Sequence, residues 1–137
     1  MKYFLAKTDP ETYSLEDFKK EGETNWDGVH SYQAINVIKT WKIGDMMIIY
    51  HSLGEARIVG LAKVTGSPEK DENDSRGISW HAKVKFIKEF TEDQKITLKE
   101  IKQLGIFNDF ALVRQSRLST MECPDNFVNW LKEKGVL

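Results

Sequence analysis

Two apolar runs joined by a short polar link constrain this chain more than any other feature. The first run, residues 46–49, continues directly into Tyr50-His51-Ser52, and the second covers residues 57–64. The link around Gly54 is so short that the chain must reverse its direction there. The sequence therefore predicts an antiparallel hairpin made of strands 46–51 and 57–64.

Short strands and short amphipathic helices account for the rest of the chain. The strands are predicted at residues 3–6, 80–86 and 116–121, and the helices at residues 14–22, 32–41, 97–104 and 124–134. The polar, acidic residues 67–77 are expected to form a mobile loop. The resulting order, β-α-α-β-β-β-α-β-α, predicts an α+β domain with a mostly antiparallel, curled sheet flanked by helices.

Chain length, charge and cysteine content narrow the class of protein. A chain of 137 residues is expected to form a single domain over residues 1–137. The net charge of −1 argues against a protein held on nucleic acid mainly by neutralising phosphates, but it is compatible with recognition of a single base in a pocket. Cys123 is the only cysteine, and no apolar stretch could span a membrane. We expect a monomer in the cytoplasm, or in the nucleus of a eukaryote.

The sequence contains no pattern of catalytic or metal-binding residues. His30, His51 and His81 lack the spacing of metal ligands, and no Cys-x-x-Cys is present. Ser52 follows His51 directly, so on a strand their side chains point to opposite faces and cannot act as nucleophile and base. A glycine-rich phosphate loop and a nucleophile elbow are also missing. We therefore expect no metal, no cofactor and no enzymatic activity.

Three polar or aromatic segments are candidates for contact with a ligand. Trp26 lies in the turn-like sequence Asn-Trp-Asp-Gly. Its indole could equally stack on a ligand or pack within the protein. Ser52 could form a hydrogen bond with the edge of a ligand. In residues 114–119, Gln115 could read a base edge while Arg114 or Arg117 stacks on it or contacts phosphate. The alternatives are a solvated strand end for Ser52 and a charged edge strand for residues 114–119.

Taken together, short motifs along nearly the whole chain resemble the EVE domain family of the PUA-like superfamily. The matching residues are Asp9-Pro10, Trp26-Asp27-Gly28-Val29, Tyr32-Gln33-Ala34, Gly44-Asp45, Tyr50-His51-Ser52, Ile58-Val59-Gly60-Leu61-Ala62, Trp80 and Arg114-Gln115-Ser116-Arg117-Leu118-Ser119. No single motif is diagnostic, but their order and spacing fit the family.

The resemblance implies a fold, a ligand and a set of contact residues. The fold would be a pseudo-barrel of five or six strands flanked by helices, related to YTH, ASCH and SRA-type domains. The ligand would be a modified base in nucleic acid, first a modified cytosine in DNA and second a base in RNA, held in an aromatic-lined pocket. By this resemblance the contact residues are Trp26, Ser52, Arg114 and Gln115, with Lys7 and Tyr32 near the mouth.

This chain departs from the family pattern in two places. Thr8 and Asp9 stand where the family often has serine and glutamate, a change that keeps a hydroxyl and a carboxylate. His30 and Ser31 stand where the family often has arginine and asparagine, so they are candidate ligand residues with altered chemistry. Two other functions also stay open. One is a hydrolase for a nucleoside or small amide, related to ASCH-type domains, using a serine or a carboxylate such as Glu55. The other is an interaction module whose pocket is vestigial.

Overall fold

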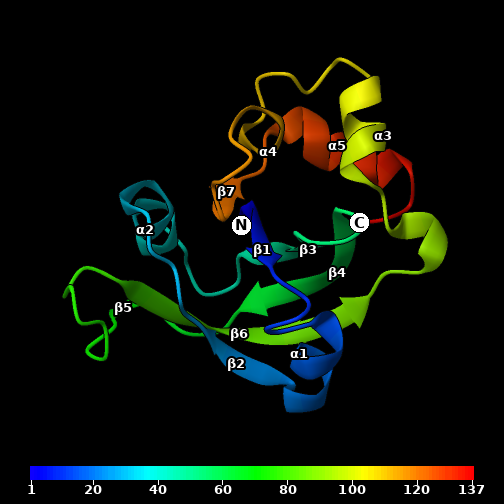
Figure 1. Ribbon diagram of the computed structural model, residues 1–137. Coiled ribbons are helices and arrows are strands. Elements are labelled where there is room, and N and C mark those ends of the chain that lie inside the picture. Colours follow the sequence, from blue (N-terminus) through cyan, green and yellow to red (C-terminus); the bar gives the residue numbers. More distant parts are fainter.

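All residues from 1 to 137 are described by a computed structural model, in which helices surround one curled mixed sheet (Figure 1). In chain order the elements are β1 (Tyr3–Thr8), α1 (Leu15–Glu21), β2 (Glu23–Trp26), α2 (Tyr32–Lys39), β3 (Met46–His51), β4 (Arg57–Val64), β5 (Glu69–Lys70), β6 (Trp80–Glu89), the 3₁₀ turn η1 (Glu92–Gln94), α3 (Leu98–Gln103), α4 (Ala111–Arg114), β7 (Thr120–Glu122) and α5 (Asp125–Glu133).

The sheet has the strand order β2-β6-β4-β3-β1-β7, and β5 pairs with β6 outside this path. The predicted hairpin is confirmed, because β3 and β4 pair antiparallel with Met46 opposite Lys63. Only β1 and β3 pair in parallel, and the long connection through α1, β2 and α2 makes that crossover possible. The α+β class and the mostly antiparallel sheet are confirmed. The sheet is not closed, since β2 and β7 remain its two edges.

Gly60 in β4 shows how α1 is held against this sheet. A Cβ atom at this position would lie 2.9 Å from Leu15 Cδ1 and 2.9 Å from the Lys88 carbonyl oxygen. Only glycine therefore allows the Leu15 side chain to approach the backbone of β4 so closely. Leu15 is the first residue of α1, so this contact fixes the start of α1 against β4.

The segment 114–119 differs from the strand predicted for residues 116–121. Arg114 ends helix α4, where its N–H donates to the Phe110 carbonyl, and a turn follows in which the Leu118 N–H donates to the Gln115 carbonyl. β7 begins only at Thr120. The prediction of a strand, and its alternative of a charged edge strand, are wrong for residues 114–119. Burial of Leu112 and Leu118 favours the compact helix and turn.

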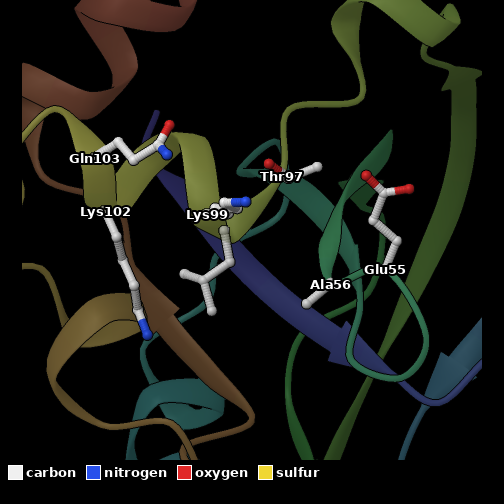
Figure 2. Close-up of a pocket in the computed structure, with 7 residues that line it drawn as sticks. Glu55, Ala56, Thr97, Lys99, Lys102 and Gln103 are labelled. Carbon is white, nitrogen blue, oxygen red and sulfur yellow. The ribbon is translucent and has the colours of Figure 1, made fainter.

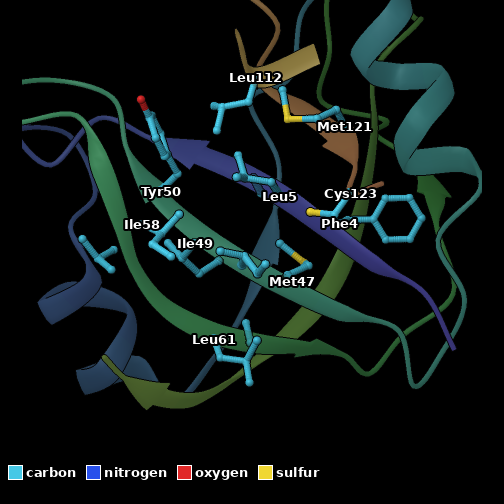
Figure 3. Packing of buried hydrophobic residues seen from close by; sticks show 14 of the residues in the cluster. Phe4, Leu5, Met47, Ile49, Tyr50, Ile58, Leu61, Leu112, Met121 and Cys123 are labelled. Atoms are coloured by element: carbon cyan, nitrogen blue, oxygen red, sulfur yellow. The ribbon is translucent and has the colours of Figure 1, made fainter. Parts of the chain in front are cut away.

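The core joins the sheet to the C-terminal elements. Figure 3 shows Leu5 of β1 between Met47 and Ile49 of β3 on one side and Leu112 and Met121 on the other. All five side chains are buried. This packing brings the turn after α4 to the end of β1. No helix of the protein combines the length and the apolar character needed to cross a bilayer.

Candidate functional site

A cavity of about 640 Å³, which we call the tryptophan cavity, opens where β1 and β2 end. Its lining residues are Lys7, Thr8, Asp9, Thr12, Tyr13, Thr24, Asn25, Trp26, Asp27 and Gly28. They come from the end of β1, the loop before α1, β2 and the turn after β2. The sheet therefore brings together two segments that are separated along the chain by α1.

Two aromatic rings form the apolar part of this cavity, and both rest on the same buried side chain. Trp26 is opposite Ala82 in the β2–β6 pair and is only 7% exposed. Its ring centroid lies 6.0 Å from that of Phe18, and the Tyr13 ring lies 6.3 Å from Phe18. Trp26 thus belongs to the core and to the cavity wall at once. Its indole is held in place before any ligand arrives.

Polar groups in the cavity fall into two sets. Thr8 and Asp9 are engaged in shaping the loop, since Thr8 Oγ1 donates to the Tyr13 carbonyl at 2.6 Å and an Asp9 carboxylate oxygen accepts from the Glu11 N–H at 2.9 Å. The exposed side chains of Asn25 and Asp27 make no hydrogen bond with the rest of the protein. They remain available to a ligand.

The Tyr13 hydroxyl lies behind the cavity wall. Its oxygen is buried near Glu21 and Thr24 but makes no hydrogen bond of good geometry. Burial, and then the nearby Glu21 carboxylate, raise the pKa of Tyr13 to about 12. The phenol therefore stays protonated, and Tyr13 presents its ring rather than its oxygen to the cavity.

Lys7 separates the tryptophan cavity from a second concavity. Its Nζ donates to the Ser116 carbonyl at 3.0 Å and lies 5.6 Å from the centre of the Tyr50 ring. Burial lowers the pKa of Lys7 from its usual range. The strand β1 and the turn after α4 are therefore joined across this one side chain, which places a cation at the border of the cavity.

The second concavity, which we call the turn hollow, has a volume of about 360 Å³. Its lining residues are Ser31, Gln33, Arg114, Gln115, Ser116, Arg117 and Leu118. Arg114 and Arg117 form no ion pair, so both guanidinium groups are available to an anion. Ser31 caps α2, where its Oγ accepts from the Ala34 N–H at 3.1 Å.

The residues expected at one pocket are thus divided between two neighbouring concavities. Lys7 and Trp26 line the tryptophan cavity, whereas Ser31, Arg114 and Gln115 line the turn hollow. Ser52 lines neither of them. Its N–H and its Oγ both donate to the Thr8 carbonyl, at 3.0 and 3.3 Å, so Ser52 contacts a residue of the cavity wall without lining the cavity.

His30 is held from a distant part of the chain. Arg76 Nη1 donates to the His30 carbonyl at 3.0 Å, and Ser79 Oγ donates to the Val29 carbonyl at 2.9 Å. Arg76 Nη2 lies 3.4 Å from His30 Nδ1. The loop before β6 therefore fixes the segment between Trp26 and α2.

We call the two contacts from Arg76 and Ser79 to the His30 and Val29 carbonyl groups the clasp. Hydrogen bonds made by the acidic loop, residues 67–77, support it. The Asp74 carboxylate accepts from the N–H groups of Ile78 and Ser79 at 3.0 and 2.9 Å. These bonds, led by the one from Ser79, lower the pKa of Asp74 to about 2. The sequence pattern suggested only a polar loop, because nothing in it links Arg76 to a residue 46 positions earlier.

Glu55, the carboxylate considered for a hydrolase, lies in a different hollow. That hollow has a volume of about 640 Å³ and is lined by Glu55, Ala56, Thr97, Leu98, Lys99, Lys102 and Gln103. Figure 2 shows Glu55 and Lys102 at opposite ends of it. It contains no serine, cysteine or histidine, and no group of three metal-binding side chains occurs in the protein.

Comparison with known proteins identifies one family and several structures of the same fold. The family model described as "EVE domain" matches residues 2–134. Human thymocyte nuclear protein 1 is 36% identical over 74 residues, which cover 45% of this chain and 33% of that protein. The chain thus matches about a third of the length of this relative.

Among solved structures, a crystal structure of a protein from Agrobacterium tumefaciens has a TM-score of 0.88 and 27% identity, with 100% of this chain and 94% of that chain covered. The human THYN1 protein in complex with 5-methylcytosine-containing DNA has a TM-score of 0.85 and 24% identity, covering 98% of each chain. A YTH domain from Zygosaccharomyces rouxii, solved with N6-methyladenosine RNA, has a TM-score of 0.59 and 16% identity and covers 97% and 85%. The last two show likeness of fold alone.

Proposed function

Because the chain belongs to the EVE domain family, we propose that it binds nucleic acid by taking one modified base into the tryptophan cavity, without catalysing a reaction. The observation that carries this proposal is the combination of a fixed indole wall with free polar side chains at the same cavity. A volume of about 640 Å³ falls within the range of about 300–1,000 Å³ that is usual for small-ligand pockets.

The flat wall supports a base as the ligand. The Trp26 ring is already packed against Phe18. Stacking on a base therefore costs it little additional conformational entropy. Stacking of this kind contributes about 1–3 kcal/mol, while extruding a base from a duplex costs a few kcal/mol. Stacking alone therefore only balances the cost, and polar contacts must supply the net affinity.

Asn25 and Asp27 are the side chains we assign to those polar contacts. The exocyclic amino group of cytosine is a hydrogen-bond donor that carboxylates accept, and an asparagine amide can donate and accept at once. A base that lacks an amino group would lose these contacts. The cavity thus suits a base that carries an amino group.

DNA with a modified cytosine is the first candidate for the polymer. The human THYN1 protein was solved with 5-methylcytosine DNA, and the more distant YTH domain with N6-methyladenosine RNA. Arg114 and Arg117 of the turn hollow are free cations beside the cavity, separated from it by Lys7. They would contact the phosphates next to the bound base.

The test is a binding titration with labelled DNA and RNA strands that carry 5-methylcytosine, N6-methyladenine or the plain base at one position. We expect the wild type to prefer one modified strand over its plain counterpart about tenfold or more, since one extra methyl group against an apolar wall contributes about 1–3 kcal/mol. Trp26→Ala should lose binding, but Trp26 is also part of the core.

A second variant therefore changes an exposed side chain. Asp27→Asn should weaken binding of the modified and the plain strand alike, because both bases carry the amino group assigned to this carboxylate. It should leave the unfolding transition unchanged, and Asp93→Asn, at the exposed turn η1, is its matched control. Equal affinity for modified and plain strands in the wild type would contradict the proposal. Turnover of a nucleoside or small amide that Glu55→Gln abolishes would favour the hydrolase instead.

A further inference from the structure

A third concavity, which we call the α2–β5 groove, lies on the outer side of α2. Its volume is about 340 Å³, and its lining residues are Tyr32, Ile35, Asn36, Lys39, Lys70, Gly77, Ile78 and Trp80. Tyr32, Asn36 and Lys39 lie along one stripe of α2, because residues three or four apart share a helix face. Figure 1 shows α2 beside the end of the sheet that carries β5.

The groove presents an open aromatic ring. Tyr32, the first residue of α2, is 69% exposed and lies apart from the tryptophan cavity. It directly follows Ser31, which lines the turn hollow. Consecutive residues at the start of α2 therefore line the turn hollow and the α2–β5 groove.

The charged side chains of the groove are all cationic. Lys39 Nζ lies 5.1 Å from the centre of the Trp80 ring, and neither Lys39 nor Lys70 forms an ion pair. The acidic neighbours of Lys70 along the chain, Glu69, Asp71 and Glu72, do not line the groove. The lining of the groove thus carries two cations and no carboxylate, on a chain whose net charge is −1.

We propose that the α2–β5 groove binds the part of the nucleic-acid strand next to the read base, with one flanking base stacked on Tyr32 and its phosphate near Lys39 and Lys70. Exposed rings together with unpaired cations are the features with which proteins hold single strands, because every base has a face that can stack. An acidic peptide would use the lysines but would gain little from the ring. This inference rests on the proposed function, since both sites hold the same strand.

The experiment compares two probes: 5-methyl-2′-deoxycytidine as a free nucleoside, and a single strand that carries the same base in its middle. Tyr32→Ala should weaken binding of the strand about five- to tenfold, the lower end of the effect of losing one stacked base. It should leave the affinity for the nucleoside unchanged. Tyr32→Phe keeps the ring and should bind the strand as the wild type does.

The lysines are tested by salt dependence. Lys39→Ala and Lys70→Ala should each reduce the slope of log affinity against log salt for the single strand by about 0.7, whereas Lys102→Ala, at the hollow that contains Glu55, should leave the slope unchanged. Unfolding curves of all variants serve as a check on the fold, which these exposed positions should not affect.

Three results would overturn the inference. The first is a strand affinity of Tyr32→Ala equal to that of the wild type, and the second is loss of nucleoside binding together with strand binding. The third is displacement of the strand by poly-glutamate as effectively as by an unlabelled strand, because the lysines and not the ring would then hold the occupant. Failure of the proposed function has a different signature, because the wild type would then bind modified and plain strands equally while Tyr32→Ala still weakened both.

Discussion

Trp26 shows how one residue serves the core and the candidate site together. It is 7% exposed and packs against Phe18, yet it lines the tryptophan cavity. A side chain held in this way cannot move far to meet a ligand. The stacking surface is therefore preorganised, and the free side chains of Asn25, in β2, and Asp27, just after it, supply the adaptable contacts.

A substitution at Tyr13 tests whether its buried hydroxyl group contributes to stability or binding. Because its hydroxyl oxygen is buried without a hydrogen bond, Tyr13→Phe should leave the free energy of unfolding unchanged or raise it by up to about 1 kcal/mol. The preference for the modified base should stay as in the wild type. Urea unfolding and strand binding measure these two outcomes.

The control for Tyr13→Phe is Tyr3→Phe at the start of β1, outside the cavity. A loss of more than about 1 kcal/mol in Tyr13→Phe alone would show that the hydroxyl does bond Glu21 or Thr24. That result would contradict the unpartnered oxygen described above.

At the scale of elements, the loop between β5 and β6 acts as a clasp on the turn between β2 and α2. Arg76 and Ser79 hold the carbonyl groups of His30 and Val29, and Asp74 holds the clasp itself together. The clasp positions the segment that separates the tryptophan cavity from the start of α2. Its loss should therefore affect ligand binding as well as local stability.

The pH dependence of stability should reveal this clasp. The pKa of Asp74 is lowered to about 2 in the folded protein from its ordinary value of 3.8. A carboxyl group with a lowered pKa stabilises the fold above its ordinary pKa, and this stabilisation is lost as pH falls towards 2. Asp74→Asn should abolish that part of the pH dependence, which urea unfolding between pH 5 and about pH 2 can measure.

The matched control for Asp74→Asn is Asp93→Asn, which removes an exposed carboxylate far along the chain. Amide hydrogen exchange at Ile78 and Ser79 should accelerate in Asp74→Asn only. Equal pH profiles for Asp74→Asn and the wild type would show that the clasp does not depend on this carboxylate.

At the scale of the whole molecule, cations gather where the open concavities meet although the net charge is only −1. The concavities near α2 contribute Lys7, Lys39, Lys70, Arg114 and Arg117. A small and local set of cations limits the electrostatic part of binding. Specificity must then come from the base in the cavity.

The number of cations at the concavities determines the expected salt dependence of binding. With at most these five cations on phosphates, the slope of log affinity against log salt for a single strand should be no steeper than about −3.5. Plain and modified strands should give the same slope at different affinities, because reading the base releases no counterions. A much steeper slope would require a basic surface beyond the three concavities.

The sequence by itself determined the β3–β4 hairpin, the capped starts of α1 and α3 and the α+β class, because continuous apolar runs, turn residues and caps act over a few neighbouring positions. It did not determine that residues 111–114 form a helix, since burial of Leu112 and Leu118 against distant elements decides this.

Only the tertiary structure decided which polar residues meet. Lys7 reaches Ser116, which is 109 positions away, and Arg76 reaches His30. Such contacts depend on how the strands are ordered in the sheet, and no local pattern encodes that order. The resemblance named Trp26 and Arg114 for one pocket, and the fold places them in two neighbouring concavities divided by Lys7.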